Sequence, residues 1–141
     1  MASVNRGCKA IFKSKGVTVL VENVGITRAP VLRTTGITQS KNLYDWILTH
    51  KIQLAEIMER TSRHLKLLEV SCFMAGRNVY ARFSFSTGEA MGMNMVTIAV
   101  DKALSFIERE TKAKAISLSG NMCTDKKPSS CNYIFGRGKK V

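Results

Sequence analysis

The sequence predicts an α+β domain in which an antiparallel sheet carries its helices on one face. Two apolar runs, residues 68–74 and 79–85, are separated by Ala75-Gly-Arg-Asn78, a composition typical of a hairpin turn. Apolar residues at helical spacing occur before this hairpin and after it. The order between residues 30 and 118 is therefore strand, helix in two pieces, strand, strand, helix, strand. This β-α-β-β-α-β order is ferredoxin-like.

In the N-terminal part, alternating valines over residues 17–21 predict a strand, and residues 30–33 predict a short extended segment. Ser40 is expected to cap the first helix. The apolar stripe of that helix consists of Leu43, Trp46 and Ile47. A second helical stretch carries Leu54, Ile57 and Met58 and ends in Arg60-Thr-Ser-Arg63.

In the C-terminal part, the second run of the hairpin alternates with a period of two, which separates two faces. One face is Val79, Ala81, Phe83 and Phe85, and the other is Tyr80, Arg82 and Ser84. Residues 86–94 lead into a long helix. Its apolar stripe is Val96, Val100, Ala103, Leu104 and Ile107. Residues 113–119 predict the last strand.

The composition, 45% hydrophobic and 23% charged over 141 residues, is typical of one folded domain with or without flanking pieces. No apolar run approaches the ~20 residues that span a bilayer, so no membrane contact is expected from this segment. Four cysteines without a CxxC pair, with only two histidines, predict no metal site and a reducing, cytoplasmic location.

The net charge is +12, from 22 Lys and Arg against 10 Asp and Glu. This balance implies anionic partners, and both nucleic acid and phosphate-rich small molecules satisfy it.

The segment Ser119–Pro128 places Asp125 beside Lys126 and Lys127, between the conformationally special Gly120 and Pro128. A loop that holds a lysine against a developing oxyanion would need such ends, because electrostatic stabilisation depends on donors fixed before the reaction starts. A polar surface loop has the same composition, so these residues alone leave both interpretations open.

Two other stretches suit phosphate groups. Gly88–Asn94 has glycines that allow close backbone approach and leads into a helix N-terminus, although the GxGxxG fingerprint is absent. Arg60–Arg63 offers two guanidinium groups and two hydroxyls to a phosphomonoester. A simple turn into a helix and a basic helix end are the plainer alternatives.

Seven segments carry a resemblance that extends over nearly the whole chain. They are Ala2–Cys8, Thr27–Val31, Thr61–Arg63, Ala75–Tyr80, Thr87–Met95, Ser119–Pro128 and Gly136–Lys139. In content and order they resemble the 3-hydroxy-3-methylglutaryl-coenzyme A reductase family, in its eukaryotic and archaeal class.

The resemblance implies reduction of hydroxymethylglutaryl-CoA to mevalonate and CoA with two NADPH, in the mevalonate pathway of isoprenoid biosynthesis. It implies that Lys126 is the catalytic lysine, which polarises the thioester carbonyl. The implied substrate-binding residues are Arg28, Ser119, Asn121, Asp125 and Lys127 for the hydroxymethylglutaryl part, and Ser3, Asn5, Arg6 and Lys9 for the CoA phosphates. The implied cofactor-binding residues are Ser62 and Arg63 for the NADP 2′-phosphate, and Glu89, Met91, Gly92, Met93 and Asn94 for the dinucleotide.

The chain departs from the family pattern at two positions: Glu89 stands where Asp is usual, and His64 replaces the usual aromatic residue. The family's catalytic glutamate, aspartate and histidine are not among these residues, so the chain alone is expected to be inactive. Residues 1–29 are expected to be an N-terminal flank that belongs to the large substrate-binding domain. Residues 30–118 are expected to form the small NADP-binding domain. Residues 119–141 are expected to form the catalytic-lysine loop and the start of the return of the chain into the large domain. The intact enzyme is expected to be a homodimer or higher homo-oligomer that binds no nucleic acid.

A basic ferredoxin-like RNA-binding module is the alternative, because the common RNA-recognition domain shares this topology. However, residues 78–85 lack the glycine pair of the RNA-recognition pattern and offer only Tyr80 on the polar face.

Overall fold

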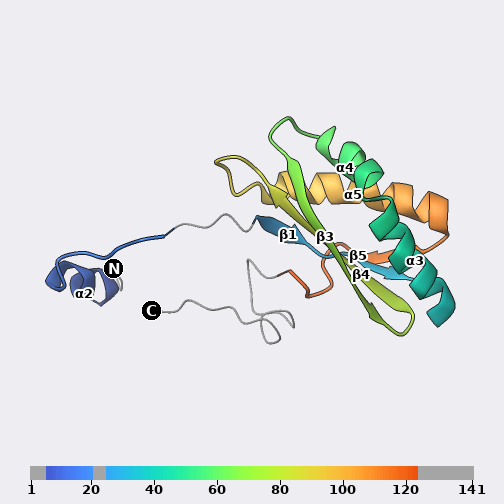
Figure 1. The fold of residues 1–141 in the computed structure, drawn as a ribbon, viewed down its shortest axis with the longest axis horizontal. Helices are drawn as coiled ribbons and strands as arrows, with labels where there is room; N and C mark the ends of the chain where they lie inside the picture. Colours follow the sequence, from blue (N-terminus) through green and yellow to red (C-terminus); the bar gives the residue numbers. More distant parts are fainter. Residues whose placement is uncertain (1–5, 21–24, 124–141) are drawn as a thin grey trace.

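The computed structural model describes residues 6–20 and 25–123, which form four helices and five strands (Figure 1). In chain order these are α2 (Gly7–Lys13), β1 (Ile26–Arg28), β2 (Val31–Arg33), α3 (Ile37–Thr49), α4 (Lys51–Glu59), β3 (Lys66–Ala75), β4 (Asn78–Ser86), α5 (Met93–Thr111) and β5 (Lys114–Ser117). Within these residues no helix combines the length and the apolar character needed to cross a bilayer.

Strand β4 is the centre of the sheet. It pairs antiparallel with β3 along one edge and with both β1 and β2 along the other. Strand β2 in turn pairs antiparallel with β5. The short strands β1 and β2 therefore act as one strand interrupted at Ala29-Pro30, and the spatial order is β3, β4, β1/β2, β5. The predicted α+β class with an antiparallel sheet is confirmed.

The core lies between one face of the sheet and helices α3, α4 and α5, which cover that face as Figure 1 shows. The alternation predicted for β4 is confirmed, because Val79, Ala81, Phe83 and Phe85 are fully buried on the helix side. The predicted stripe of α5 is buried there as well. Cys72 of β3 lies in this core, and burial raises the pKa of its thiol to about 12, so the thiol stays protonated.

Three local predictions are wrong. Residues 17–20 form no strand, and the side chains of Val17, Val19 and Leu20 are 59%, 70% and 84% exposed. An alternating pattern forms a stable strand only where a neighbouring strand and an apolar layer pair with it, and this segment has neither. Residues 7–13, for which no element was expected, form α2.

Ser40 does not cap α3. Gly36 is the N-cap residue, and Ser40 lies fully buried one turn inside the helix. Its hydroxyl is 2.7 Å from Thr34 Oγ1, so it ties the helix to the end of β2. The Ser40 hydroxyl, which the local sequence pattern assigns to the helix cap, is thus used in a tertiary hydrogen bond instead.

Lys112, the C-cap of α5, has a left-handed backbone with φ 57° and ψ 10°. Because a Cβ is disfavoured there, Lys112→Gly is expected to raise the free energy of unfolding by about 0.5–1 kcal/mol, measured by urea denaturation. The control is Lys102→Gly at an exposed position inside the same helix, which is expected to lower it by about 1 kcal/mol. A loss of stability in both variants would contradict the proposed strain at Lys112.

Candidate cofactor and substrate site

Two loops meet at one end of the sheet. The α4–β3 connection, residues 60–65, and the β4–α5 connection, residues 87–92, are brought side by side because Lys66 pairs with Ser86 in the hairpin. In Figure 1 both loops lie at the end of the domain nearest the label of β1. The structure therefore brings Ser62 and Arg63 to the same end of the domain as Met91–Asn94. These are the residues expected to bind the dinucleotide.

The first loop is held in a compact turn by its own hydrogen bonds. The Ser62 amide donates to the Glu59 carbonyl at 3.2 Å, and the Ser62 carbonyl accepts from the Leu65 amide at 3.2 Å. The Leu65 side chain is fully buried and fixes the loop to the core. Arg63 is exposed, and its Nε donates to His64 Nε2 at 3.0 Å. A half-buried hydroxyl and an exposed guanidinium are thus presented on a fixed backbone.

Glu59 closes this loop at its base. Its Oε1 accepts from the Leu67 amide at 2.9 Å, and its Oε2 pairs with Lys66 Nζ at 2.9 Å. The hydrogen bond from Lys66, then that from the Leu67 amide, lowers the pKa of the Glu59 carboxyl. This carboxylate joins the end of α4 to the start of β3.

The second loop depends on contact between Thr87 and Gly92. Thr87 Oγ1 donates to the Ala90 carbonyl at 2.6 Å, which curls the loop back on itself. Gly92 has φ 70°, and a Cβ there would lie 2.5 Å from Thr87 Cβ, so both the conformation and the space demand glycine. The Glu89 and Met91 side chains are exposed on this loop.

Gly92 is also the N-cap of α5, and it supplies no side-chain acceptor to the first turn. The first amide groups of a helix have no partner within the helix, and they carry the positive end of its dipole. Met93 and Asn94 belong to this turn. The turn is therefore suited to an anionic or strongly polar group.

Arg28, which is predicted to bind substrate, lies beside the same helix. Its Nε and Nη2 donate to Thr97 Oγ1 at 3.1 and 2.6 Å, and Thr97 Oγ1 donates to the Met93 carbonyl at 2.8 Å. The guanidinium is thus held by the second turn of α5. On the same strand, the Ala29 carbonyl accepts from the Gly120 amide at 2.7 Å, which brings the Ser119–Asn121 segment alongside.

The remaining predicted residues are not gathered there. Arg6 and Lys9 are exposed at the start of α2, which buries no residue and lies apart from the sheet in Figure 1. Ser3, Asn5, Asp125, Lys126 and Lys127 lie outside the described residues.

Sequence reasoning missed three residues that build the site: Glu59, Thr87 and Thr97. Each acts through a partner distant in the chain or through a loop closure, so composition gave no signal. Only the glycine at position 92, five residues after Thr87, could have indicated that a side chain packs there.

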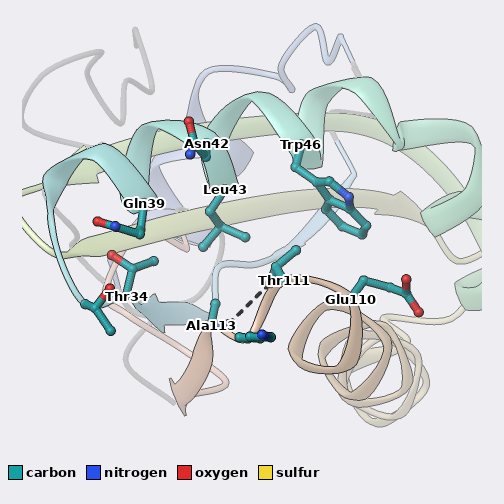
Figure 2. A pocket seen from close by; sticks show the side chains of 10 residues that line it. Thr34, Gln39, Asn42, Leu43, Trp46, Glu110, Thr111 and Ala113 are labelled. Carbon is teal, nitrogen blue, oxygen red and sulfur yellow. Dashed lines mark hydrogen bonds between the residues drawn. The ribbon is translucent and has the colours of Figure 1, made fainter.

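A pocket with a volume of about 370 Å³ lies at the opposite end of the domain, between α3 and the end of α5 (Figure 2). It contains none of the predicted site residues. Its walls are Thr34, Thr35, Gln39, Asn42, Leu43, Trp46, Glu110, Thr111, Lys112 and Ala113. The Trp46 ring stacks on the His50 ring, with 4.2 Å between centroids, and its centroid lies 5.9 Å from that of Phe106. The indole is therefore already packed against two side chains of the domain.

The fold and the paired loops define an α+β domain with a polar, anion-compatible site at one sheet end. The sequence model of the hydroxymethylglutaryl-coenzyme A reductase family matches residues 1–141. The chain belongs to this family.

Similar proteins agree with this assignment. The chain is 49% identical to 3-hydroxy-3-methylglutaryl-coenzyme A reductase of Methanothermobacter thermautotrophicus, over 100% of this chain and 36% of the relative. It is 47% identical to 3-hydroxy-3-methylglutaryl-coenzyme A reductase 2 of Dictyostelium discoideum, over 100% of this chain and 27% of the relative. The chain thus spans about a third of the length of these relatives.

Among solved structures, the fold resembles the class II reductase of Streptococcus pneumoniae bound to NADPH in open conformations. The TM-score is 0.68 at 19% identity, over 88% of this chain and 36% of that chain. This similarity supports the fold. The RNA-binding alternative has no support in these comparisons, and Gly120 packs on the Tyr80 ring that such a module would offer.

Glu59→Gln is expected to lower the free energy of unfolding at pH 7 by about 1 kcal/mol, because it removes the charge that pairs with Lys66 while keeping most of the side-chain shape. A carboxyl whose folded pKa is lowered stabilises the fold above its unfolded pKa, and this contribution is lost as pH falls through the folded value. The difference between wild type and variant should therefore shrink from pH 7 to about pH 3 in urea denaturation. A difference that stays constant over this range would contradict the assigned ion pair.

Proposed function

We propose that this chain is the cofactor-binding part of an NADPH-dependent hydroxymethylglutaryl-CoA reductase, which forms mevalonate and CoA. The observation that carries the proposal is the convergence of the Ser62–Arg63 loop and the Gly92–Asn94 helix start at one end of the sheet. In a chain that belongs to this family, this arrangement supports a dinucleotide site. Residues 30–118 would be the small NADP-binding domain, and residues 1–29 and 119–141 would belong to the segments that join it to a large substrate domain.

Ser62 and Arg63 would bind the 2′-phosphate of NADPH. A guanidinium presents a planar fork to phosphate oxygens, and a neighbouring hydroxyl adds one more donor. Arg63 is exposed and its loop is anchored by Glu59, so little ordering would be needed on binding. His64 accepts a hydrogen bond from Arg63 and would help to orient it.

Met91, Gly92, Met93 and Asn94 would hold the rest of the dinucleotide. The Gly92 backbone can approach a ligand closely, and the α5 N-terminus favours negative charge. Glu89 is exposed on the same loop, where its carboxylate would need a hydroxyl donor from the ligand rather than a phosphate. Each bound NADPH would supply one hydride, and two NADPH in succession would supply the two that reduction of the thioester to the alcohol requires.

The substrate would be held by the other group of residues. Arg28, Ser119, Asn121, Asp125 and Lys127 would bind the hydroxymethylglutaryl part, with Arg28 as a carboxylate fork. Ser3, Asn5, Arg6 and Lys9 would meet the CoA phosphates. The Lys126 ammonium would polarise the thioester carbonyl and hold the negative charge that develops on its oxygen.

The net charge of +12 fits these ligands, since CoA, NADPH and the substrate carboxylate are all anionic. The remaining catalytic groups of the family, a glutamate, an aspartate and a histidine, are not supplied by these 141 residues. We therefore expect the chain alone not to turn over, and the complete enzyme to be a cytoplasmic homo-oligomer of the eukaryotic and archaeal class.

The cofactor assignment is tested by titrating the chain with NADPH and with NADH and following backbone amide resonances. NADPH is expected to shift the amides of Ser62, Arg63 and Met91–Asn94, and NADH to shift only those of the second loop. Loss of a charged hydrogen bond costs about 1.5–3 kcal/mol, so Arg63→Gln should weaken NADPH binding by about 10-fold to 100-fold and leave NADH binding unchanged.

The matched control is Arg109→Gln, an exposed arginine at the far end of α5, which should leave both affinities unchanged. Equal responses to the two dinucleotides at Ser62 and Arg63 would contradict the 2′-phosphate assignment.

A further inference from the structure

The guanidinium of Arg28 meets a single hydroxyl where β1 packs against α5. Its Nε and Nη2 both donate to Thr97 Oγ1, at 3.1 and 2.6 Å, although the two residues are 69 positions apart in the chain. Both side chains are half-buried. The contact exists only in the folded domain, because it needs the strand and the second turn of the helix side by side.

The Thr97 hydroxyl uses its whole hydrogen-bonding capacity in this contact. A hydroxyl has one hydrogen to donate and two lone pairs that accept. The hydrogen goes to the Met93 carbonyl at 2.8 Å, one turn back in the helix, and the oxygen accepts from the two N–H groups of Arg28. In a helix the threonine side chain has two common χ1 rotamers, and the bond to a carbonyl one turn back selects one of them. The position of the oxygen is therefore set by the helix backbone.

The orientation of the guanidinium follows from this bond. Nε and Nη2 form one edge of the planar group, and Thr97 occupies that edge. Within the described part of the chain, the side-chain hydrogen bonds of Arg28 all go to Thr97, which leaves the edge formed by Nη1 and Nη2 available. A carboxylate binds such an edge with two parallel hydrogen bonds. The base of the side chain is fixed as well, because Arg28 pairs with fully buried Phe83 in the β1–β4 register.

We propose that Thr97 is a positioning residue for the substrate: it holds Arg28 so that the Nη1–Nη2 edge meets the carboxylate of the hydroxymethylglutaryl group. The inference rests on the proposed function, in which Arg28 binds that carboxylate. A free arginine side chain would lose its rotamer freedom when the substrate binds, which weakens binding by about twofold to tenfold. In this domain Thr97 orders the side chain before the substrate arrives.

The test uses the complete enzyme, with the rest of the chain present. Thr97→Val keeps the shape of the side chain and removes the hydroxyl. It is expected to raise KM for hydroxymethylglutaryl-CoA by about threefold to tenfold, while kcat and KM for NADPH stay within about 1.5-fold. A general disturbance of the start of α5 would instead raise KM for NADPH, because the proposed dinucleotide loop leads into the same helix.

Two further variants separate positioning from packing. Thr97→Ser keeps the hydroxyl and should return KM for hydroxymethylglutaryl-CoA to within about 1.5-fold of wild type. Arg28→Met removes the guanidinium without adding a hydrogen-bonding group. In that background Thr97→Val should cause no further rise in KM, because Thr97 acts through Arg28 and the two effects are not additive.

Thr111→Val is the matched control. Thr111 Oγ1 donates to the Ile107 carbonyl at 2.6 Å, one turn back at the other end of α5, so the same substitution removes the same kind of bond within the helix. All three kinetic constants should be unchanged. Thermal denaturation shows whether each variant folds, and Thr97→Ala replaces Thr97→Val in the comparison if the valine variant does not fold.

Four results would overturn the inference: an unchanged KM for hydroxymethylglutaryl-CoA in the folded variant, an equal rise in KM for NADPH, no recovery in Thr97→Ser, or a further rise in the Arg28→Met background. The proposed function fails separately. If the complete wild-type enzyme does not oxidise NADPH with hydroxymethylglutaryl-CoA, the function itself is wrong. If it does and Thr97→Val leaves KM unchanged, only the role of Thr97 is wrong.

Discussion

The antiparallel register between β3 and β4 determines where both proposed cofactor loops lie. Because Lys66 pairs with Ser86, the loop that enters β3 and the loop that leaves β4 emerge at one end of the sheet. The same register places Phe83 opposite Val70 in the core, so a slip by one residue would turn these apolar side chains to the open face. The burial that stabilises the hairpin therefore also fixes the relative position of Ser62 and Asn94.

The two loops obtain their rigidity in different ways, and each suits its proposed ligand group. The first loop is closed by a charged anchor, Glu59, and presents a guanidinium on a side chain that can still adjust to a phosphate. The second is closed by packing, since Thr87 fills the space that a Cβ on Gly92 would need, and it presents backbone amides that cannot move far. Backbone donors held in this way need little reorganisation when a ligand binds.

The sequence predicted the buried faces of strands and helices, because hydrophobic periodicity encodes them. It did not predict features that depend on contacts with residues distant in the chain. The β4 alternation and the α5 stripe are confirmed because burial of one face decides both. The valines of residues 17–21 show the same alternation, yet residues 17–20 form no strand, because a strand needs a neighbour that local pattern does not reveal. The prediction that Ser40 caps α3 is wrong for a related reason, because its hydroxyl forms a hydrogen bond with Thr34 instead. Within the proposed site, residue type predicts Ser62, Arg63 and Gly92, whereas Glu59 and Thr97 act through contacts that only folding creates.

The interruption at Ala29-Pro30 links these observations. Proline has no amide hydrogen, so the strand can only accept hydrogen bonds at this residue, and the Pro30 carbonyl does so from the Ala81 amide at 3.1 Å. On the other edge the Ala29 carbonyl accepts from Gly120. Just before the break, Arg28 lies opposite buried Phe83 and therefore points to the helix side, where Thr97 holds it. Just after it, Val31 lies on the open face under Gly120. One interrupted strand thus serves both faces of the sheet: Arg28 contacts α5 on the helix side, and Val31 contacts Gly120 on the open face.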